Sequence, residues 1–530
     1  MKRTTISLIA VATALAAVTG VASLTAPDGS EGGPAPTAAR LPVERSSMLC
    51  PAPGTSELAE TRYISYTPAG AKGGGAARDS AGGEATAAEL RASASVLADT
   101  DDKSKDDKAK KDDQAKKDEK DEKAEPGKSP GGKPVVSVKE PGKPVAADAD
   151  GGDAPALVGT ATGALAPGWT TQQTTSVSAG DGRGLLGVSC TAPDTDFWFP
   201  GASLAEKRQD YLHLTNPDDA SAVADIELYG KDGKLKSTLG DGVTIPPGAA
   251  VPVLLSTLTT DKAEDITVHV ATRTGRVGAV VRAAHATEGS DWLAASGDPA
   301  GTVVLPGVPA DATAVELVAF APGDDDAALK IQLAGPTGTI TPAGHETLRV
   351  KSGMTARLDL DDLTKGEAAS LLLSPAEGGG PVPVVAALRV VRGKGEKKET
   401  AFIPAAGPVG ERATVADNHS RGSLLSITAP GKAAEVEVVA SAGTEAGTRV
   451  VKKYTVKSRT TLTITSPVPE GLKGAYAVTV RTLSGGPVHA SRLLEIPEDD
   501  IPMFTVQNLL DDRGTVSVPE ARQDLSVLDD

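Results

Sequence analysis

The sequence predicts an all-β protein built from tandem immunoglobulin-like β-sandwich repeats, on three observations. The first is a strand-like apolar pair that recurs in steps of 105 residues (331−226 and 436−331), at Ile226/Leu228, Ile331/Leu333 and Val436/Val438. Repetition in one order predicts copies of one fold. The second is the pattern of short alternating runs, about seven per hundred residues, which suits a two-sheet sandwich and no helix. The third is an aromatic content of only 3%, which predicts cores of Val, Ile, Leu and Ala.

The first 27 residues have the pattern of a signal peptide or an N-terminal anchor. Two basic residues precede an uncharged stretch from Ile6 to Leu24, and Val21-Ala22-Ser23 offers small residues for cleavage. Both interpretations place the rest of the chain outside the cytoplasm, as a secreted or anchored protein of the cell envelope. The chain then meets a membrane only through this segment, if it is uncleaved. Residues 28–40, rich in Gly, Pro and Ala, are expected to form a spacer.

Residues 41–68 and 154–300 are expected to form the first sandwich, with a disordered tether at 69–153 between them. Residues 101–125 of the tether carry eleven Asp or Glu and nine Lys, and they have no apolar face that could pack. The chain has two cysteines, Cys50 and Cys190. In an exported chain such a pair is expected to form a disulfide, which would make the first sandwich discontinuous.

Two further sandwiches are expected at residues 301–400 and 401–502. A closing strand repeats the pattern Val-x-Ala-x-x-Arg, at Val277–Arg282 and Val384–Arg389, with a shortened copy at Val488–Arg492. A β-propeller is the alternative fold, although the repeat is about twice the length of a blade. The tail at 503–530 contains one strand candidate, Thr515–Val518, before an acidic end.

Composition and motifs argue against several classes of function. The formal net charge of −16 and the pI near 5.0 would repel nucleic acid. The six histidines show no metal-ligand spacing, and no Gly-x-Ser-x-Gly elbow is present. Gly182 to Gly187 matches a dinucleotide fingerprint in its letters, but a strand pattern follows where a helix is required. We therefore expect no cofactor, no metal ion and no catalytic residue.

The best candidate for a ligand-binding surface contains Asp194, Asp196 and Trp198, with Tyr211 shortly after. Trp198 lies between two phenylalanines, and three adjacent aromatic residues cannot all face one core. An exposed ring beside carboxylates suits stacking on a sugar, and a pair of acids could serve a glycosidase. The alternative is that Trp198 packs under a neighbouring loop or at a domain junction.

Several local sequences are similar to a Streptomyces-like, actinobacterial family of secreted proteins of unknown function, namely Ser189–Asp194, Phe197–Gly201, Leu214–Pro217, Pro246–Gly248 and Asp291–Leu293. The resemblance implies export from a high-GC Gram-positive bacterium. It supplies no catalytic residues.

These observations lead to two hypotheses of function. The first is an exported, non-enzymatic structural or adhesion module of the cell envelope, whose partner is a cell-wall glycan or another envelope protein. The second is a secreted protein that binds or hydrolyses glycans through the region of Asp194, Asp196 and Trp198.

Overall fold

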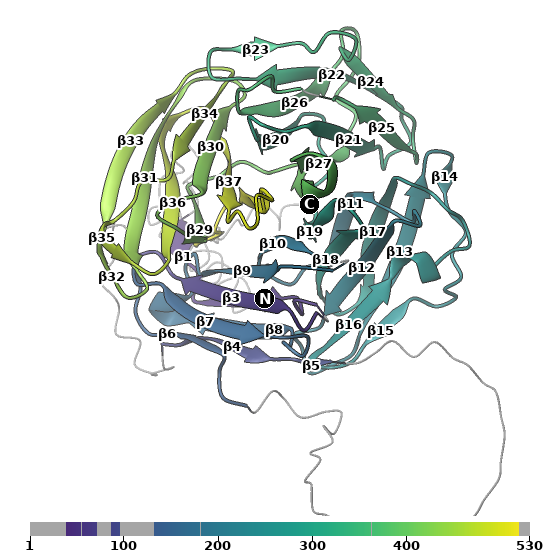
Figure 1. The fold of residues 1–530 in the computed structure, drawn as a ribbon. Coiled ribbons are helices and arrows are strands. Elements are labelled where there is room, and N and C mark those ends of the chain that lie inside the picture. Colours follow the sequence, from purple (N-terminus) through teal and green to yellow (C-terminus); the bar gives the residue numbers. More distant parts are fainter. Residues whose placement is uncertain are drawn as a thin grey trace, which may run out of the picture. The chain divides into compact units, whose positions relative to one another are not determined.

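The computed structural model describes residues 39–54, 56–70, 86–95, 132–180, 182–361 and 363–518 (Figure 1). Within these residues the chain is nearly all strand, with three short 3-10 helices, η1 (Gly163–Leu165), η2 (Leu255–Thr257) and η3 (Gly395–Lys397). The prediction of an all-β chain is therefore confirmed. The predicted leader at 1–27 and most of the spacer at 28–40 lie outside the described residues. No helix in the described part is long and apolar enough to span a membrane.

The chain separates into two bodies, a small one of residues 1–41 and 516–530 and a large one of residues 42–515. The described part of the small body lies in the two-stranded sheet formed by β1 (Ala39–Pro42) and β39 (Thr515–Val518). The strand predicted at Thr515–Val518 is thus present, and the acidic end at 519–530 lies outside the described residues.

The described part of the large body contains eight sheets of four or five strands, which form four successive pairs along the chain. We name these pairs sandwich 1 (residues 45–190), sandwich 2 (194–293), sandwich 3 (300–404) and sandwich 4 (409–511). Each pair encloses its own hydrophobic core, which contains buried residues from both sheets. A core between two sheets is typical of a β-sandwich and favours it over a propeller blade, which is a single sheet.

Sandwich 1 pairs the sheet β2-β8-β4-β6 with the sheet β10-β9-β3-β7. Its strands are β2 (Arg45–Cys50), β3 (Ala59–Tyr66), β4 (Ala88–Ala92), β6 (Val136–Val138), β7 (Val145–Asp150), β8 (Leu157–Thr162), β9 (Thr170–Val177) and β10 (Gly184–Ser189).

Sandwich 2 pairs the sheet β11-β17-β13-β14, in which β15 also pairs with β13, with the sheet β19-β18-β12-β16-β5. Its strands are β5 (Ala94–Ser95), β11 (Asp196–Ala202), β12 (Arg208–Thr215), β13 (Ala222–Gly230), β14 (Gly233–Lys234), β15 (Val243–Ile245), β16 (Ala249–Leu254), β17 (Ile266–Thr274), β18 (Gly278–His285) and β19 (Gly289–Leu293). The short strand β5 comes from the sandwich 1 part of the chain and pairs in parallel with β16.

Sandwich 3 pairs the sheet β20-β26-β22-β23, in which β24 also pairs with β22, with the sheet β25-β21-β27-β28. Its strands are β20 (Val303–Val308), β21 (Ala314–Phe320), β22 (Ala327–Ala334), β23 (Thr339–Ile340), β24 (Thr347–Val350), β25 (Thr355–Asp359), β26 (Ala369–Pro375), β27 (Val385–Arg392) and β28 (Glu399–Pro404).

Sandwich 4 pairs the sheet β29-β36-β31-β33 with the sheet β34-β30-β37-β38, and carries the two-stranded sheet β32-β35. Its strands are β29 (Arg412–Asn418), β30 (Ser423–Ala429), β31 (Ala434–Gly443), β32 (Ala446–Thr448), β33 (Val450–Val456), β34 (Thr460–Thr465), β35 (Glu470–Lys473), β36 (Tyr476–Gly485), β37 (His489–Glu495) and β38 (Phe504–Leu509).

Alternation of apolar and polar residues explains why these segments form half-buried strands. In β13 the buried residues include Ala222, Ala224, Ile226 and Leu228, and the residues between them are only partly buried. Successive side chains of a strand point to opposite faces, so this pattern gives one face to the core and one to the outside. The cores are mainly aliphatic, as the low aromatic content predicts.

The structure differs from the predicted boundaries because the repeat occurs four times. The expected first sandwich, 41–68 plus 154–300, contains two cores, one around Cys50 and Trp169 and one around Phe199 and Leu228. In sandwich 1 the equivalent strand β4 carries Ala88 and Leu90, so one member of the apolar pair is a small alanine, and a charged insertion divides the copy. The later boundaries at 400 and 502 also move, because β28 closes sandwich 3 at Pro404 and β38 closes sandwich 4 at Leu509.

The segment 69–153, for which the composition predicts a disordered tether, contains strands at both ends. β4 and β5 lie before its most charged part, and β6 and β7 lie after it. β7 pairs with β3 from Val145 to Asp150, in the stretch that the prediction assigns to an extended linker. A bulk composition rich in Pro, Gly and Lys hides such short alternating runs. Residues 71–85 and 96–131 of the predicted tether lie outside the described residues.

The final strand of each sandwich lies at the edge of its sheet and contacts edge strands of other sandwiches. β10 contacts β19 and β38, and β28 contacts the same two strands. These four strands begin at steps of 105, 110 and 105 residues (289−184, 399−289 and 504−399). An edge strand that is covered in this way cannot pair with another chain. The four sandwiches therefore meet through equivalent strands.

Candidate functional site

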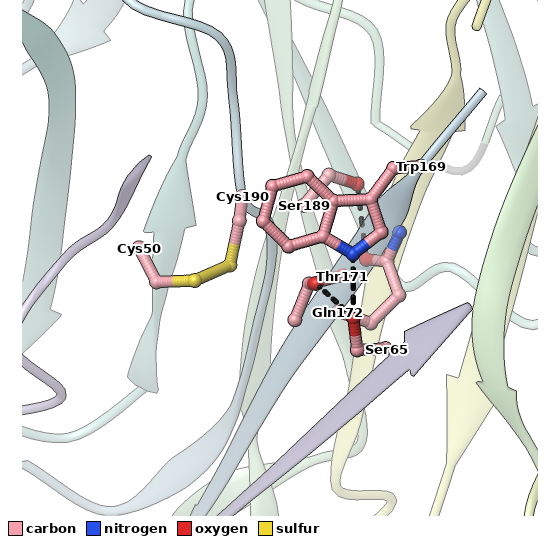
Figure 2. Close-up of a disulfide and its surroundings, with 7 residues drawn as sticks. All are labelled: Cys50, Ser65, Trp169, Thr171, Gln172, Ser189 and Cys190. Carbon is pink, nitrogen blue, oxygen red and sulfur yellow. Dashed lines mark hydrogen bonds between the residues drawn. A yellow bond between two sulfur atoms is a disulfide. The ribbon is translucent and has the colours of Figure 1, made fainter. Parts of the chain in front are cut away.

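A disulfide joins Cys50 and Cys190, as predicted. Cys50 ends β2 in one sheet of sandwich 1, and Cys190 follows β10 in the other sheet, so the bond links the two layers. Figure 2 shows hydrogen-bonded polar groups beside it. Trp169 Nε1 donates to Ser65 Oγ at 2.9 Å, and Thr171 Oγ1 donates to the same oxygen at 2.8 Å. All of these groups are buried, so this region stabilises the fold and offers no free thiol.

The predicted residues Asp196 and Trp198 lie on the outer face of sandwich 2. Phe197 and Phe199 alternate with them and enter the core. Trp198 pairs with His269 on the neighbouring strand β17, and His269 pairs in turn with Glu227 on β13. Strand register therefore places Trp198, His269 and Glu227 side by side on one face, as expected for directly opposed residues of an antiparallel sheet.

His269 is held between two carboxylates. Its Nε2 lies 2.9 Å from Asp196 Oδ2, and its Nδ1 lies 3.2 Å from Glu227 Oε2. Glu227 also accepts hydrogen bonds from the Tyr229 hydroxyl at 2.7 Å and from Lys234 Nζ at 2.5 Å. Against a rise due to burial, the hydrogen bonds from Lys234, Tyr229 and His269 lower the pKa of Glu227 to about 2. Glu227 is therefore ionised at neutral pH, and three side chains of this cluster pair with its carboxylate.

The ring of Trp198 takes part in a junction between sandwiches. It stacks on His269 with ring centroids 3.7 Å apart, and it stacks on Phe320 of sandwich 3 at 5.3 Å. Tyr229 lies 4.7 Å from the same Phe320 ring, and its backbone carbonyl accepts a hydrogen bond from Thr355 Oγ1 at 2.6 Å. Trp198 therefore packs against the next sandwich, which agrees with the domain-junction alternative considered for it.

The other two predicted residues do not join this cluster. Asp194 forms backbone hydrogen bonds with Val277, and its carboxylate accepts the Thr195 backbone N–H at 2.8 Å. Tyr211 lies on β12, in the opposite sheet of sandwich 2, where the Arg282 guanidinium lies 5.4 Å from the centre of its ring. Of the four residues predicted as one surface, Asp196 and Trp198 thus share one cluster through His269, and Asp194 and Tyr211 lie in other environments.

A second polar cluster, centred on Arg357 of β25, lies at the junction of sandwiches 2 and 3. The guanidinium lies 2.7 Å from Glu316 and 3.3 Å from Asp265, with Glu264 and Asp359 also paired to it. Burial and the neighbouring Glu316 raise the pKa of Asp265 to about 7, against the lowering effect of Arg357. One arginine is shared by four carboxylates, so Asp265 retains a proton close to neutral pH.

A third group of acids lies where the edge strands meet. Asp291 of β19 accepts the Gly187 backbone N–H at 2.9 Å and the Thr505 hydroxyl at 3.0 Å, and burial raises its pKa well above the usual range. Glu399 of β28 is fully buried, with Arg183 Nη2 3.7 Å from its Oε2. Burial raises the pKa of Glu399 to about 9, so this contact is one between an arginine and a neutral acid at pH 7.

The chemistry of these clusters is that of packing and charge pairing. Within the described ranges, no group of three or more His, Cys, Asp or Glu side chains has the geometry of a metal site. The carboxylates of Asp196 and Glu227 both pair with the His269 ring. The contacts in these clusters hold neighbouring strands and neighbouring sandwiches in register.

Four residues of the Trp198 cluster were absent from the predicted site: Glu227, Tyr229, His269 and Phe320. Alternation along β13 and β17 does assign Glu227, Tyr229 and His269 to the face away from the core. The sequence contains no signal for the register that aligns His269 with Trp198, or for the contact with Phe320 from another sandwich.

Comparison with known proteins identifies a family. The model of a family of unknown function, DUF5719, matches residues 145–467. The matched stretch begins at the first residue of β7 and ends just beyond β34, so it contains all of sandwich 3 and every strand of sandwich 2 except β5. No curated protein and no solved structure matches the chain.

Proposed function

The chain belongs to DUF5719, a family of unknown function, and from this premise we propose that it is an exported, non-enzymatic module of the cell envelope. In this proposal the sandwiches are immunoglobulin-like repeats that form a scaffold for spacing or adhesion. The source is an actinobacterium, and the partner is a cell-wall glycan or another envelope protein.

The observation that carries the proposal is the sharing of cores between successive sandwiches. Phe402 comes from the last strand of sandwich 3, yet it is part of the core of sandwich 2. Phe504 comes from the last strand of sandwich 4 and is part of the core of sandwich 3. Each aromatic side chain buries a large apolar area, so neighbouring sandwiches stabilise one another. Mutual stabilisation through shared cores is what a scaffold needs in order to keep its dimensions under mechanical force.

Buried hydrogen bonds between sandwiches support the same function. Thr174 of sandwich 1 donates to Asp417 of sandwich 4 at 2.5 Å, and Thr505 of sandwich 4 donates to Asp291 of sandwich 2 at 3.0 Å. Removing one partner of a buried pair leaves an unsatisfied polar group, which costs about 1–3 kcal/mol. Such contacts favour a fixed arrangement over independent domains joined by hinges.

Two features support export. Disulfides such as Cys50–Cys190 persist in oxidising compartments and are rare in the cytosol. The first 27 residues carry the basic and apolar regions of an export signal. We propose that the protein is secreted, or is anchored by this segment if it stays uncleaved.

Binding to cell walls tests the proposal against the glycan-active alternative. The exported protein is incubated with purified walls of the source organism, both untreated and stripped of protein, and is then sedimented. We expect it to sediment with the walls and to release no soluble sugar. Release of sugar that is lost in Asp196→Asn, but kept in a matched Asp194→Asn variant, would contradict the proposal. Recovery of the native protein in the cytosolic fraction would also contradict it.

A further inference from the structure

Three arginines occupy equivalent positions in successive sandwiches, at the end of the repeated pattern Val-x-Ala-x-x-Arg. Arg282 lies on β18, Arg389 on β27 and Arg492 on β37, and each pairs with a residue of the following edge strand. The internal repeat therefore offers three versions of one site, which can be compared with one another.

In two of the three versions the guanidinium has strong partners. Arg389 forms an ion pair with Glu288 through its Nη2. Arg492 donates from Nη1 to the Asp417 carbonyl at 2.7 Å and from Nη2 to Gln507 Oε1, and the Asp417 carboxylate acts on it electrostatically. Both arginines are largely buried, and a buried guanidinium requires such compensation.

Arg282 lacks this compensation. Within the described residues no carboxylate forms an ion pair with it. Its Nε is buried with no hydrogen-bond acceptor, as are the Nε atoms of Arg389 and Arg492, so the three arginines differ in the partners of their other guanidinium nitrogens. Its one described partner is the ring of Tyr211, 5.4 Å from the guanidinium carbon. Burial lowers the pKa of Arg282, and it also lowers the pKa of Arg492, to about 10, against the raising effect of Asp417. Among the residues that the structure describes, the positive charge of Arg282 thus has no anionic partner.

A cavity of about 20 Å³ lies beside Arg282, between sandwich 1 and sandwich 2. This volume suffices for one occupant the size of a water molecule or a halide ion. The wall contributes a second unpaired polar group, because Ser290 Oγ is buried with no partner. Gly54 has φ of +147°, and a side chain there would meet the guanidinium, so glycine keeps the space open. The rest of the wall is mainly apolar and includes Ala59, Val177 and Leu186, together with Ser56, whose hydroxyl accepts a hydrogen bond from the Leu58 backbone N–H.

We propose that this cavity is a binding site for a small monovalent anion of halide size, held by the Arg282 guanidinium and the Ser290 hydroxyl. The anion replaces the carboxylate or carbonyl oxygens that compensate the equivalent arginines of sandwiches 3 and 4. Charge-assisted hydrogen bonds are stronger than neutral ones, so the cavity prefers an anion to water. The ion ties β18 and β19 of sandwich 2 to the adjoining wall of sandwich 1.

Bromide is the probe for this site, because it scatters X-rays anomalously. Crystals of the full chain grown in gluconate and soaked in sodium bromide are expected to show an anomalous peak within hydrogen-bond distance of the guanidinium. In solution, the unfolding temperature of the wild type is expected to rise with the logarithm of bromide concentration, relative to sodium gluconate of equal ionic strength. An ordered water in the cavity and no anomalous peak would overturn the proposal.

Two variants separate specific binding from general salt effects. Arg282→Gln is expected to lose the bromide response. Ser290→Asp supplies a carboxylate in the cavity wall, so it is expected to unfold at a higher temperature than the wild type in gluconate and to show no bromide response. Arg389→Gln is the matched control, because its site has Glu288 as a partner, and it is expected to keep the wild-type bromide response. If the unfolding temperature of Arg282→Gln rises with bromide as much as that of the wild type, the proposal is overturned. If Arg282→Gln does not fold, Ser290→Asp takes its place, and a bromide response of wild-type size in that variant overturns the proposal.

Discussion

Replacing Glu399 with glutamine is predicted to stabilise the protein in a pH-dependent way. Glu399 is fully buried on β28, and the nearest guanidinium atom, Arg183 Nη2, is 3.7 Å away, which is too far for a hydrogen bond. Burial raises the pKa of Glu399 to about 9 from its ordinary value of 4.5; Arg183 opposes the rise and Asp291 adds to it. The folded state therefore binds this proton more tightly than the unfolded state does.

The sign and the size of the effect follow from linkage between protonation and folding. The stability that the protonated Glu399 contributes is complete below pH 4.5 and is lost progressively as the pH rises from 4.5 to about 9. A pH of 7 lies 2.5 units (7−4.5) above the pKa of Glu399 in the unfolded state, so loss of the proton stabilises the unfolded state. The folded state keeps the proton and gains no such stabilisation. At roughly 1.4 kcal/mol per unit, this is at most about 3 kcal/mol. Glutamine has the same shape and does not ionise, so it removes this cost.

Urea denaturation of the wild type and Glu399→Gln at several pH values measures the difference. We expect the free energy of unfolding of Glu399→Gln to match the wild type near pH 4, to exceed it by up to about 3 kcal/mol at pH 7, and to exceed it further at pH 8.5. Glu396→Gln, the same substitution at an exposed position three residues earlier, is the control and should show no such trend. A difference for Glu399→Gln that is independent of pH would refute the reasoning.

Three further predictions follow from the contacts described above. Replacing both Cys50 and Cys190 with alanine should lower the unfolding free energy by roughly 2–5 kcal/mol, seen as a lower midpoint of the thermal unfolding transition; unchanged thermal unfolding would contradict the structural role of the disulfide. Phe402→Ala should cost about 3–5 kcal/mol and should expose both sandwich 2 and sandwich 3 to limited proteolysis, whereas cleavage confined to sandwich 3 would argue against a shared core. Burial and Glu316 raise the pKa of Asp265 to about 7, so its protonated form favours folding at low pH and that contribution is lost as the pH rises through 7; Asp265→Asn should therefore gain stability over the wild type at pH 8 but not at pH 4, and equal gains at both pH values would contradict this.

Local patterns in the sequence were sufficient to predict the strands and the disulfide. Alternation in segments such as Ala222–Gly230 reflects burial of one strand face, which is a local property. The pairing of Cys50 with Cys190 follows from their number and from the expectation of export. The 105-residue period identifies the repeat where the pair consists of large aliphatic residues, but it does not identify the copy in sandwich 1, whose pair is Ala88 and Leu90 and whose chain carries a long insertion.

The junctions could not be predicted, because they depend on register and on contacts between distant parts of the chain. Nothing in the residues around Trp198 specifies that Phe320 of another sandwich packs on its ring. Likewise, the repeated arginine pattern is visible in the sequence, but the difference between Arg282 and Arg389 appears only when Glu288 is located in space. Composition also misled the prediction for β6 and β7, since three to six alternating residues are enough to add a strand to an existing sheet.

Native-state hydrogen exchange at increasing urea concentration is the most direct test of the central claim that the four sandwiches form one interlocked scaffold. The amides of the edge strands β10, β19, β28 and β38 report on it, because these strands contact one another across sandwiches. We expect all four strands to lose protection at the same urea concentration, in one cooperative unit. Loss of amide protection at four different urea concentrations, one for the edge strand of each sandwich, would contradict a single interlocked scaffold.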